Sequence, residues 1–167
     1  LGSRGLGDVY KRQLWGYVND ISEEEQSQFA VMCAGLPDGS IYLSFRGTDN
    51  TITGWREDFN MGYLSETPGQ LKAAAYVEQM LGDGSCPVRI GGHSKGGNLA
   101  DYAAVHCSSG LQDRILAVYS NDGPGFRRDI VEGAAYQRVL PKIHTILPES
   151  SIVGMLLEHQ EAYEVVR

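Results

Sequence analysis

The sequence of 167 residues has neither a basic tract nor a long apolar run. Its formal net charge is −7, and the phosphate backbone of nucleic acids binds positively charged surfaces, so no nucleic-acid partner is expected. No apolar stretch approaches the roughly 20 residues that span a bilayer, so no transmembrane segment is expected, and no signal peptide is visible. Repeats and low-complexity segments are missing too. The composition is that of an acidic globular protein with enough residues for one domain with a core.

Cysteine is scarce, and its spacing fits neither a disulfide framework nor a zinc site. Cys33, Cys86 and Cys107 stand apart, without the C-x-x-C spacing of metal and redox motifs. We expect reduced thiols in a cytoplasmic protein, because disulfides are rare in that compartment. No other feature of the sequence calls for a metal or a cofactor, and none indicates the oligomeric state.

Both ends of the sequence are expected to be truncated. The chain begins with Leu1 rather than methionine, and it stops at Arg167 inside a strand-like run. Residues 1–13 show neither helical nor strand periodicity, so we interpret them as a non-native or disordered leader, with a native flexible terminus as the alternative. Residues 14–167 are expected to form a single domain, incomplete at its C-terminus.

The most informative segment is 90–98, which reads I-G-G-H-S-K-G-G-N and contains the pattern G-x-S-x-G. An apolar strand precedes it and an alanine-rich helix follows, which is the context of a nucleophile elbow. Such a turn needs almost no side chain two positions before and after its serine, and these positions are Gly92 and Gly96. The pattern predicts Ser94 as a catalytic nucleophile; a glycine-rich structural turn is the alternative.

Strand-like and helix-like segments alternate along the chain. The predicted strands are 29–34, 40–45, 87–90, 115–119, 143–147 and 162–166, and the predicted helices are 54–63, 69–81, 98–107 and 127–139. This alternation favours an α/β fold with a mostly parallel sheet and helices on both faces. The loops 47–53 and 120–125 and the elbow then meet at the carboxyl ends of the strands, where such sheets bind substrates.

A serine nucleophile needs an acid that orients its base, and Asp122 is the candidate. In α/β hydrolases the acid follows the serine along the chain, and the base follows the acid. Asp122 stands at the end of a predicted strand, directly before Gly-Pro-Gly, where a carboxylate faces the strand tips. The alternative is a turn or helix cap, a common use of Asp in this context.

His159 is the candidate base, because it is the histidine that follows the acid and lies near a predicted loop. His93 is adjacent to the serine, so it is expected to pack under the turn instead of reaching the serine hydroxyl. His106 lies within the elbow helix, and His144 lies in a predicted strand, where burial is expected. The alternative is a base beyond Arg167.

Two backbone N–H groups are candidates for an oxyanion hole. One belongs to Lys95, directly after the serine, and the other belongs to Thr48, in the strand end F-R-G-T-D. An ion pair of Arg46 with Asp58, with Trp55 beneath, is expected to hold this loop. A simple surface pair and a core aromatic are the alternative.

Three ordered motifs give the chain a resemblance to a known family. F-R-G-T at 45–48, G-W-R-E-D-F at 54–59 and G-H-S-K-G-G-N-L-A at 92–100 resemble the fungal-type (class 3) lipases. A lysine after the serine and the segment S-N-D-G-P-G-F at 120–126 are similar to a bacterial branch of that group. The resemblance covers roughly 29–167. It implies an α/β-hydrolase fold, with Ser94 as nucleophile and Lys95 and Thr48 as oxyanion donors.

The sequence departs from the class 3 pattern at the acid, the base and the elbow. Those lipases place the acid after a later strand, but residues 148–153 carry serines there, whereas 121–124 resembles the acid segment of animal-type lipases. Asp122 therefore remains the candidate. The bacterial branch carries its histidine in a later Q-H-D segment. Lys95, in place of the usual leucine, either sets a cation beside the oxyanion and favours a polar or anionic acyl group, or points to solvent.

The sequence thus predicts a cytoplasmic bacterial serine hydrolase of the lipase or esterase type, which cleaves a small-molecule or lipid ester through an acyl-enzyme on Ser94. Acyl transfer or thioester hydrolysis on the same residues is an alternative. A second alternative, from a different functional class, is a non-catalytic lipase-like binding module. A histidine within about 3 Å of the serine hydroxyl distinguishes the enzyme from the module.

Overall fold

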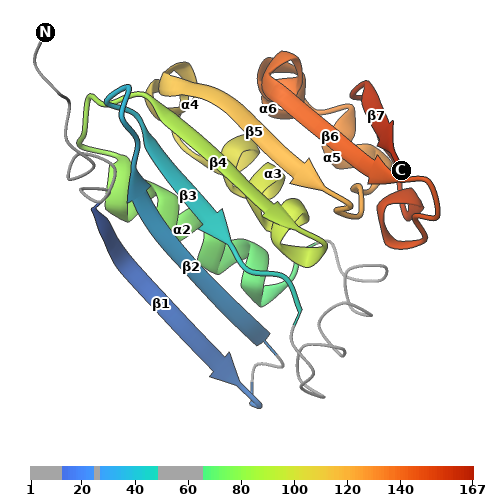
Figure 1. Cartoon of the computed structure of the whole chain (residues 1–167), viewed down its shortest axis with the longest axis horizontal. Coiled ribbons are helices and arrows are strands. Elements are labelled where there is room, and N and C mark those ends of the chain that lie inside the picture. Colours follow the sequence, from blue (N-terminus) through green and yellow to red (C-terminus); the bar gives the residue numbers. More distant parts are fainter. Residues whose placement is uncertain (1–12, 25–26, 49–65) are drawn as a thin grey trace, which may run out of the picture.

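The computed structural model describes residues 13–24, 27–48 and 66–167, which build one sheet with helices packed against it (Figure 1). The seven strands follow one another across the sheet in chain order. They are β1 (Leu14–Ser22), β2 (Ser27–Gly35), β3 (Ile41–Phe45), β4 (Val88–His93), β5 (Ile115–Asn121), β6 (Ile143–Pro148) and β7 (Tyr163–Val166). The α-helices are α2 (Pro68–Leu81), α3 (Lys95–His106), α4 (Ser109–Arg114), α5 (Arg128–Val131) and α6 (Ala134–Val139). Two 3₁₀ turns are η2 (Leu140–Lys142) and η3 (Val153–Met155).

The first three strands are antiparallel neighbours, and all strands from β3 to β7 are parallel. The tight connection from β2 to β3 uses Gly39 at φ 82° and an Asp38 carboxylate that accepts from the Ser40 N–H at 3.0 Å. Parallel neighbours need longer crossovers, and the described helices lie in them. The expected mostly parallel sheet is therefore confirmed.

The described helices lie on one face of the sheet, behind the strands in Figure 1. Each parallel strand is added on the same side of its predecessor, and crossovers between parallel strands are right-handed, so every crossover helix falls on the same face. Helix α3 lies centrally on that face, against β4 and β5 and between α2 and α6. The crossover handedness thus decides where the core lies.

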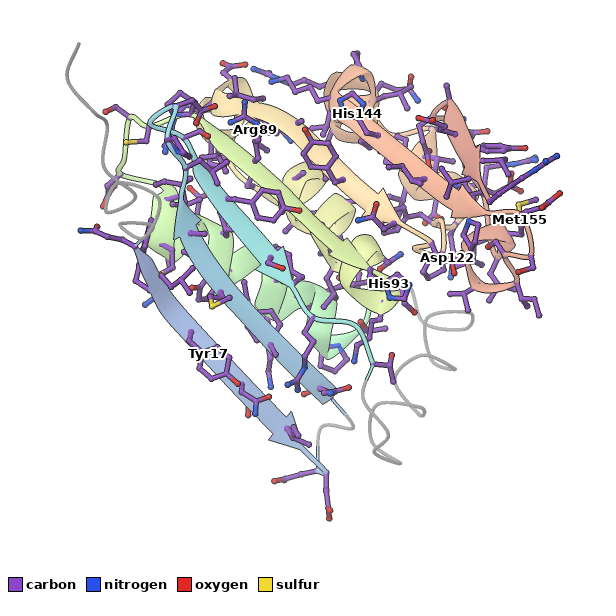
Figure 2. All side chains as sticks on the ribbon, viewed as in Figure 1. Tyr17, Arg89, His93, Asp122, His144 and Met155 are labelled. Atoms are coloured by element: carbon purple, nitrogen blue, oxygen red, sulfur yellow. The ribbon has the colours of Figure 1, made fainter. Side chains whose placement is uncertain are left out.

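The core fills the space between this face and the helices. Every residue of α3 except His106 is buried, so this helix is enclosed on all sides. Apolar side chains alternate along the strands that face it, among them the fully buried Leu43 and Ile90. The opposite face is half-buried or exposed, and Arg89 and His144 project from it (Figure 2).

Most predicted elements are confirmed, and two differences have clear causes. Strand β1 was not predicted, because Gly16 (φ 63°) lies in a register shift between Trp15 and Val18 that interrupts the alternation of side chains. The helix predicted at 127–139 is two short helices, because Gly133 is extended (φ −69°, ψ 145°). The helix predicted at 54–63 lies outside the described residues. In the part that is described, no helix is long and apolar enough to cross a membrane.

Candidate active site

Ser94 stands between β4 and α3 with a backbone that few residues other than glycine adopt. Its φ is 54° and its ψ is −129°, and it forms the N-cap of α3. Its N–H donates to the carbonyl of Asn121 on the neighbouring strand at 2.8 Å, which fixes this conformation. A side chain in such a region costs about 1–3 kcal/mol and persists where the surrounding structure enforces it. The predicted strand, strained serine and helix are therefore all present.

The glycines around Ser94 are required by close backbone packing. A Cβ atom on Gly92 would lie 2.3 Å from the carbonyl carbon and oxygen of Gly96. A Cβ atom on Gly96 would lie 2.4 Å from the carbonyl oxygen of Phe45. The two positions predicted to need small residues thus hold β4, the start of α3 and the end of β3 together.

The loop after β3 passes directly beside the serine. A Cβ atom on Gly47 would lie 2.6 Å from the carbonyl oxygen of His93 and 3.6 Å from the Cβ of Ser94. The loop that carries Thr48 is therefore next to the first turn of α3, where the Gly97 N–H donates to the Ser94 carbonyl at 2.9 Å. Two segments that the sequence assigned to an oxyanion hole are brought together here.

Arg46 donates to Asn19 Oδ1 on β1 at 2.9 Å. Its predicted partner Asp58 and the predicted supporting residue Trp55 lie outside the described residues.

The side chain of Lys95 neither flanks the oxyanion position nor points to solvent, which corrects both predictions for it. It is only 1% exposed. Its Nζ donates to the backbone oxygen of Gln28 at 2.9 Å and to the side-chain oxygen of Gln28 at 3.3 Å, on β2. The ammonium therefore ties the elbow to the sheet interior, and only the backbone N–H of Lys95 remains a candidate for catalysis.

Asn98 is a positioning residue that the sequence analysis missed. It lies one turn after Ser94 and is 1% exposed. Its Nδ2 donates to the carbonyls of Pro124 and Gly125 at 2.9 and 3.0 Å, and its Oδ1 accepts from Gln70 Nε2 at 2.8 Å. These bonds join the elbow helix to α2 and to the turn after β5. The available signal was an asparagine inside a predicted helix, where asparagine is unfavourable unless its side chain has partners.

Asp122 lies at the tip of β5 with φ 53°, and its carboxylate contacts the loop after β6. Its Oδ1 accepts from the Ser151 hydroxyl and from the Gly154 N–H, the latter at 3.1 Å. Its own N–H donates to the Ile146 carbonyl at 2.8 Å. Ser151 belongs to the segment 148–153, where class 3 lipases are expected to carry their acid. The two possible acid positions thus meet at one place, and Asp122 supplies the carboxylate there.

His159 belongs to a buried polar cluster on the helix side of the sheet. Its Nδ1 lies 2.6 Å from Glu161 Oε1, and this hydrogen bond raises the pKa of His159 against the opposing effect of burial. The Glu161 carboxylate also accepts from Tyr136 Oη at 2.6 Å, Thr145 Oγ1 at 2.9 Å and the Gln160 N–H at 3.1 Å. Burial alone would raise the pKa of Glu161, but the hydrogen bonds from His159 and Tyr136 outweigh it and lower that pKa to about 2.

Asp101, on α3, adds a second carboxyl group to this cluster. It is fully enclosed, and desolvation together with the charge of Glu161 raises the pKa of Asp101 to about 8. Neither Asp101 Oδ1 nor His159 Nε2, both buried, has a hydrogen-bond partner among the described residues. No local sequence pattern indicates this cluster, because its members come from α3, α6, β6 and the segment before β7.

The predicted triad is not joined by hydrogen bonds within the described residues. His159 is bonded to Glu161, and Asp122 is bonded to Ser151 and Gly154, so neither is bonded to Ser94. The structure thus brings Ser94 to the oxyanion loop, and it directs the side chains of Asp122 and His159 to other groups.

The other histidines correct two predictions. His93 is exposed and does not pack under the turn, because as the last residue of β4 it faces away from α3. His144 is also exposed, and its ring stacks on Tyr119 with 5.4 Å between the centroids. His106 ends α3 and stacks on Tyr102 at 3.8 Å.

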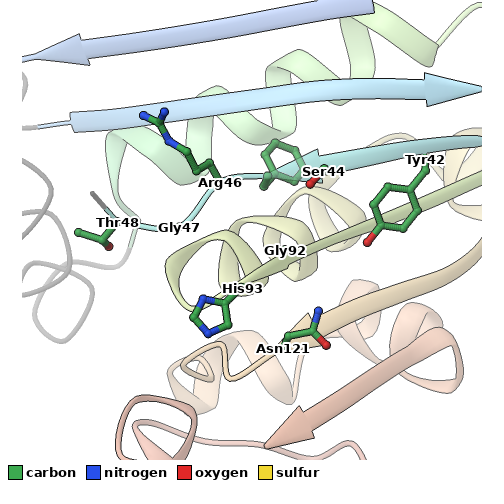
Figure 3. Close-up of a pocket in the computed structure, with 9 residues that line it drawn as sticks. Tyr42, Ser44, Arg46, Gly47, Thr48, Gly92, His93 and Asn121 are labelled. Carbon is green, nitrogen blue, oxygen red and sulfur yellow. The ribbon is translucent and has the colours of Figure 1, made fainter. Parts of the chain in front are cut away.

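A pocket of about 460 Å³ lies beside the elbow at the carboxyl ends of β3, β4 and β5 (Figure 3). Most of its lining side chains are polar. The lining residues are Tyr42, Ser44, Phe45, Arg46, Gly47, Thr48, Gly92, His93 and Asn121. No group of three or more His, Cys, Asp or Glu side chains in the described part of the chain could hold a metal ion.

Comparison with known proteins identifies the family. The sequence profile of the Mbeg1-like family matches residues 9–167. The chain belongs to the Mbeg1-like family. A comparison with curated proteins found no match.

Lipases are among the solved structures that are similar to this chain. A fungal lipase in complex with an inhibitor is 19% identical with a TM-score of 0.60, and the alignment covers 88% of this chain and 61% of that one. The Rhizomucor miehei lipase in a propeptide complex is 19% identical with a TM-score of 0.65, with coverage of 96% and 57%. A triacylglycerol lipase from Penicillium expansum is 12% identical with a TM-score of 0.59, with coverage of 92% and 69%.

The similarity establishes the lipase-like α/β-hydrolase fold of this Mbeg1-like chain. The chain spans 61% and 57% of the lengths of the first two lipases. At identities of 12–19% the fold is what the comparison shows, so the activity has to be argued from the site itself.

Proposed function

We propose that this Mbeg1-like protein is a serine hydrolase that cleaves carboxylic esters through an acyl-enzyme on Ser94. The observation that carries the proposal is the backbone of Ser94, at φ 54° and ψ −129°, on a turn that Gly92 and Gly96 hold by backbone contact. A strained serine at the N-terminus of a buried helix is a costly feature, and strain of this kind clusters at catalytic sites. The lipase-like fold supports the same proposal.

The chemistry follows from this placement. The Ser94 hydroxyl adds to the ester carbonyl while a base takes its proton, and the backbone N–H groups of Lys95 and Thr48 stabilise the oxyanion. The ester C–O bond then breaks, the alcohol leaves with that proton, and an acyl group remains on the serine oxygen. Water, deprotonated by the same base, releases the acid and restores the hydroxyl.

Asp122 and His159 complete the proposal as acid and base. Asp122 is supported by its position at the tip of β5, where its carboxylate meets the loop after β6. His159 is supported by its Nδ1 contact with the Glu161 carboxylate at 2.6 Å, since this nitrogen takes a carboxylate partner and a carboxylate there leaves Nε2 to act. As the acid, Asp122 has to take the place of Glu161 at Nδ1. For this role Nε2 has to leave its buried position beside Gly125.

The test is labelling of the 167-residue chain with a fluorophosphonate, which reacts with activated serines. We expect labelling that Ser94→Ala abolishes and that Ser108→Ala, at an exposed serine before α4, leaves unchanged. Labelling lost in His159→Gln, with wild-type stability, would support His159 as the base; labelling that persists would assign the base elsewhere. A folded chain that does not react would contradict His159 as the base. If a chain extended past Arg167 is folded and does not react either, the serine-hydrolase proposal is contradicted and a lipase-like binding module is favoured.

The acceptor of the acyl group distinguishes hydrolysis from acyl transfer. With an ester substrate, release of free acid from the acyl-enzyme on Ser94 identifies hydrolysis, and transfer of the acyl group to an added alcohol or thiol identifies an acyltransferase. A thioester substrate distinguishes a thioesterase in the same assay.

A cytoplasmic location in a bacterium belongs to the same proposal. All three cysteines are free thiols, including the exposed Cys86, and free thiols are typical of reducing compartments. The lysine after the nucleophile supports the bacterial branch. Detection of the protein in the periplasmic or secreted fraction of its source would contradict this part.

A further inference from the structure

The pocket beside the elbow lies on the face of the sheet opposite to α3. Tyr42 and Ser44 come from β3, His93 ends β4, and Asn121 ends β5, so polar side chains of three neighbouring strands surround one hollow (Figure 3). His93 and Asn121 are direct neighbours in the register of β4 and β5. The pocket also borders Gly47 and Thr48 of the proposed oxyanion loop, so a group bound there is within reach of an ester held at Ser94.

Glycine at position 91 leaves room for the Tyr42 side chain that lines the pocket. A Cβ atom there would lie 2.3 Å from the Tyr42 hydroxyl and 3.0 Å from the Cβ of Tyr119. Because Gly91 has no Cβ atom, the Tyr42 ring lies across β4 and stacks on the Tyr119 ring. The ring centroids are 6.3 Å apart, and the angle between the ring planes is 28°. Two contacts therefore fix the direction of the Tyr42 hydroxyl before any ligand arrives.

Four polar side chains of the pocket retain hydrogen-bonding capacity. Within the described part of the chain, no hydrogen bond is made by the side chains of Tyr42, Ser44, His93 or Asn121. Together they offer hydroxyl, imidazole and amide groups, which can both donate and accept. Small-molecule sites are recognised by a few convergent polar groups in a cavity of about 300–1,000 Å³, and this pocket of 460 Å³ meets that description.

The charges around the pocket restrict its ligand. No carboxylate is among the described residues that line the pocket, so none of these residues supplies a counter-charge to a cationic ligand. The Arg46 guanidinium is directed to Asn19 Oδ1 on β1 at 2.9 Å, and in Figure 3 it points away from His93 and Asn121. Neutral donors and acceptors therefore face the cavity, and these match hydroxyl and carbonyl groups.

We propose that this pocket binds a neutral, hydroxylated portion of the ester substrate and gives the enzyme a preference for polar esters over purely aliphatic ones. The proposal rests on the serine-hydrolase function proposed above. The hydroxylated portion is either the acyl group or the alcohol, since both are attached to the carbonyl group that Ser94 attacks. Tyr42 is the pocket residue whose effect on specificity can be tested most directly.

The experiment compares kcat/KM within two pairs of esters. For the acyl side the pair is p-nitrophenyl lactate and p-nitrophenyl propionate; for the alcohol side it is glycerol monopropionate and propyl propionate. We expect one pair to favour its hydroxylated member, and Tyr42→Phe to reduce that preference about threefold to tenfold, the effect of one hydrogen bond. Tyr17→Phe, at an exposed tyrosine of β1 outside the pocket, is the matched control and is expected to leave the preference unchanged.

A binding measurement separates this inference from the function on which it rests. Glycerol monopropionate is titrated into Ser94→Ala, which does not turn over, with and without Tyr42→Phe, and saturation-transfer NMR reports binding. Binding that Tyr42→Phe weakens supports the pocket even if the wild-type chain proves inactive. Equal kcat/KM within both pairs, or a preference that Tyr42→Phe and Ser44→Ala leave unchanged, together with no saturable binding, would overturn the inference and leave the hydrolase intact.

Discussion

Substitution of Gly92 by alanine tests the packing on which the elbow depends. The added Cβ would lie 2.3 Å from the carbonyl carbon and oxygen of Gly96 and 2.7 Å from the carbonyl oxygen of Phe45. All three are backbone atoms, so no side chain can rotate away, and either α3 or the end of β3 has to move. Overpacking of this kind costs about 1–3 kcal/mol. For a chain of this length each kcal/mol lowers Tm by about 2–4 °C, so we expect a decrease of about 2–12 °C.

The same displacement moves Ser94 from its position beside Gly47. A misplacement of about 1 Å can lower a rate about 100-fold, so fluorophosphonate labelling of Gly92→Ala is expected to slow by at least about tenfold. The matched control is Gly110→Ala in α4, where an added Cβ meets no atom within 4 Å. Alanine is better than glycine in a helix by about 0.5–1 kcal/mol, so the control keeps or raises Tm and labels normally.

Thermal unfolding and labelling time courses measure the two effects on the same samples. A Gly92→Ala protein with the Tm and labelling rate of the wild type would refute the described contact of β4 with the start of α3. It would also remove the argument that Ser94 is strained by its surroundings. A loss equal to that of Gly110→Ala would show that the effect is general to glycine substitution.

Two further perturbations test the positioning of α3 and its buried cluster. Asn98→Leu leaves Gln70 Nε2 and the carbonyls of Pro124 and Gly125 without partners, so we expect the free energy of unfolding to fall by about 2–5 kcal/mol in urea titrations; an unchanged value would mean that these bonds contribute nothing. The pKa of Asp101 is raised from 3.8 to about 8. At pH values between these two, the folded protein keeps a proton that the unfolded chain has lost, so the free energy of unfolding falls as the pH rises. Asp101→Asn is expected to remove this decline, on the order of a few kcal/mol, and equal slopes in both proteins between about pH 5 and about pH 8 would contradict the buried position of the carboxyl group.

Some features of the fold were predictable because they depend on neighbours in the sequence. The elbow is such a feature, since Gly92 and Gly96 flank the serine and a strained turn requires them there. Helix α2 is another: Thr67 and Gln70 form a capping box, Pro68 opens the helix and Gly82 closes it. Strand β1 escaped because the bulge at Gly16 shifts the register, so apolar residues do not alternate along it.

In the candidate site too, the features that depend on neighbours in the sequence were predictable, and the others were not. Ser94, Gly47 and the N–H groups of Lys95 and Thr48 belong to short motifs at strand ends, and parallel strands bring such ends to one edge. The direction of a long side chain does not follow from a motif. Lys95 could have faced solvent or substrate, and it lies inside the domain on Gln28, 67 residues away in the chain.

The sequence by itself determined the α/β alternation, the glycines of the elbow and the serine between them, because these follow from local backbone geometry. Tertiary structure decided the rest. It placed the described helices on one face, since chain-order strands with right-handed crossovers leave no other arrangement. It also joined Glu161 to Tyr136, 25 residues earlier, and Asp122 to Ser151, 29 residues later. Buried polar groups pair with whatever the fold brings near, and no local pattern records that choice.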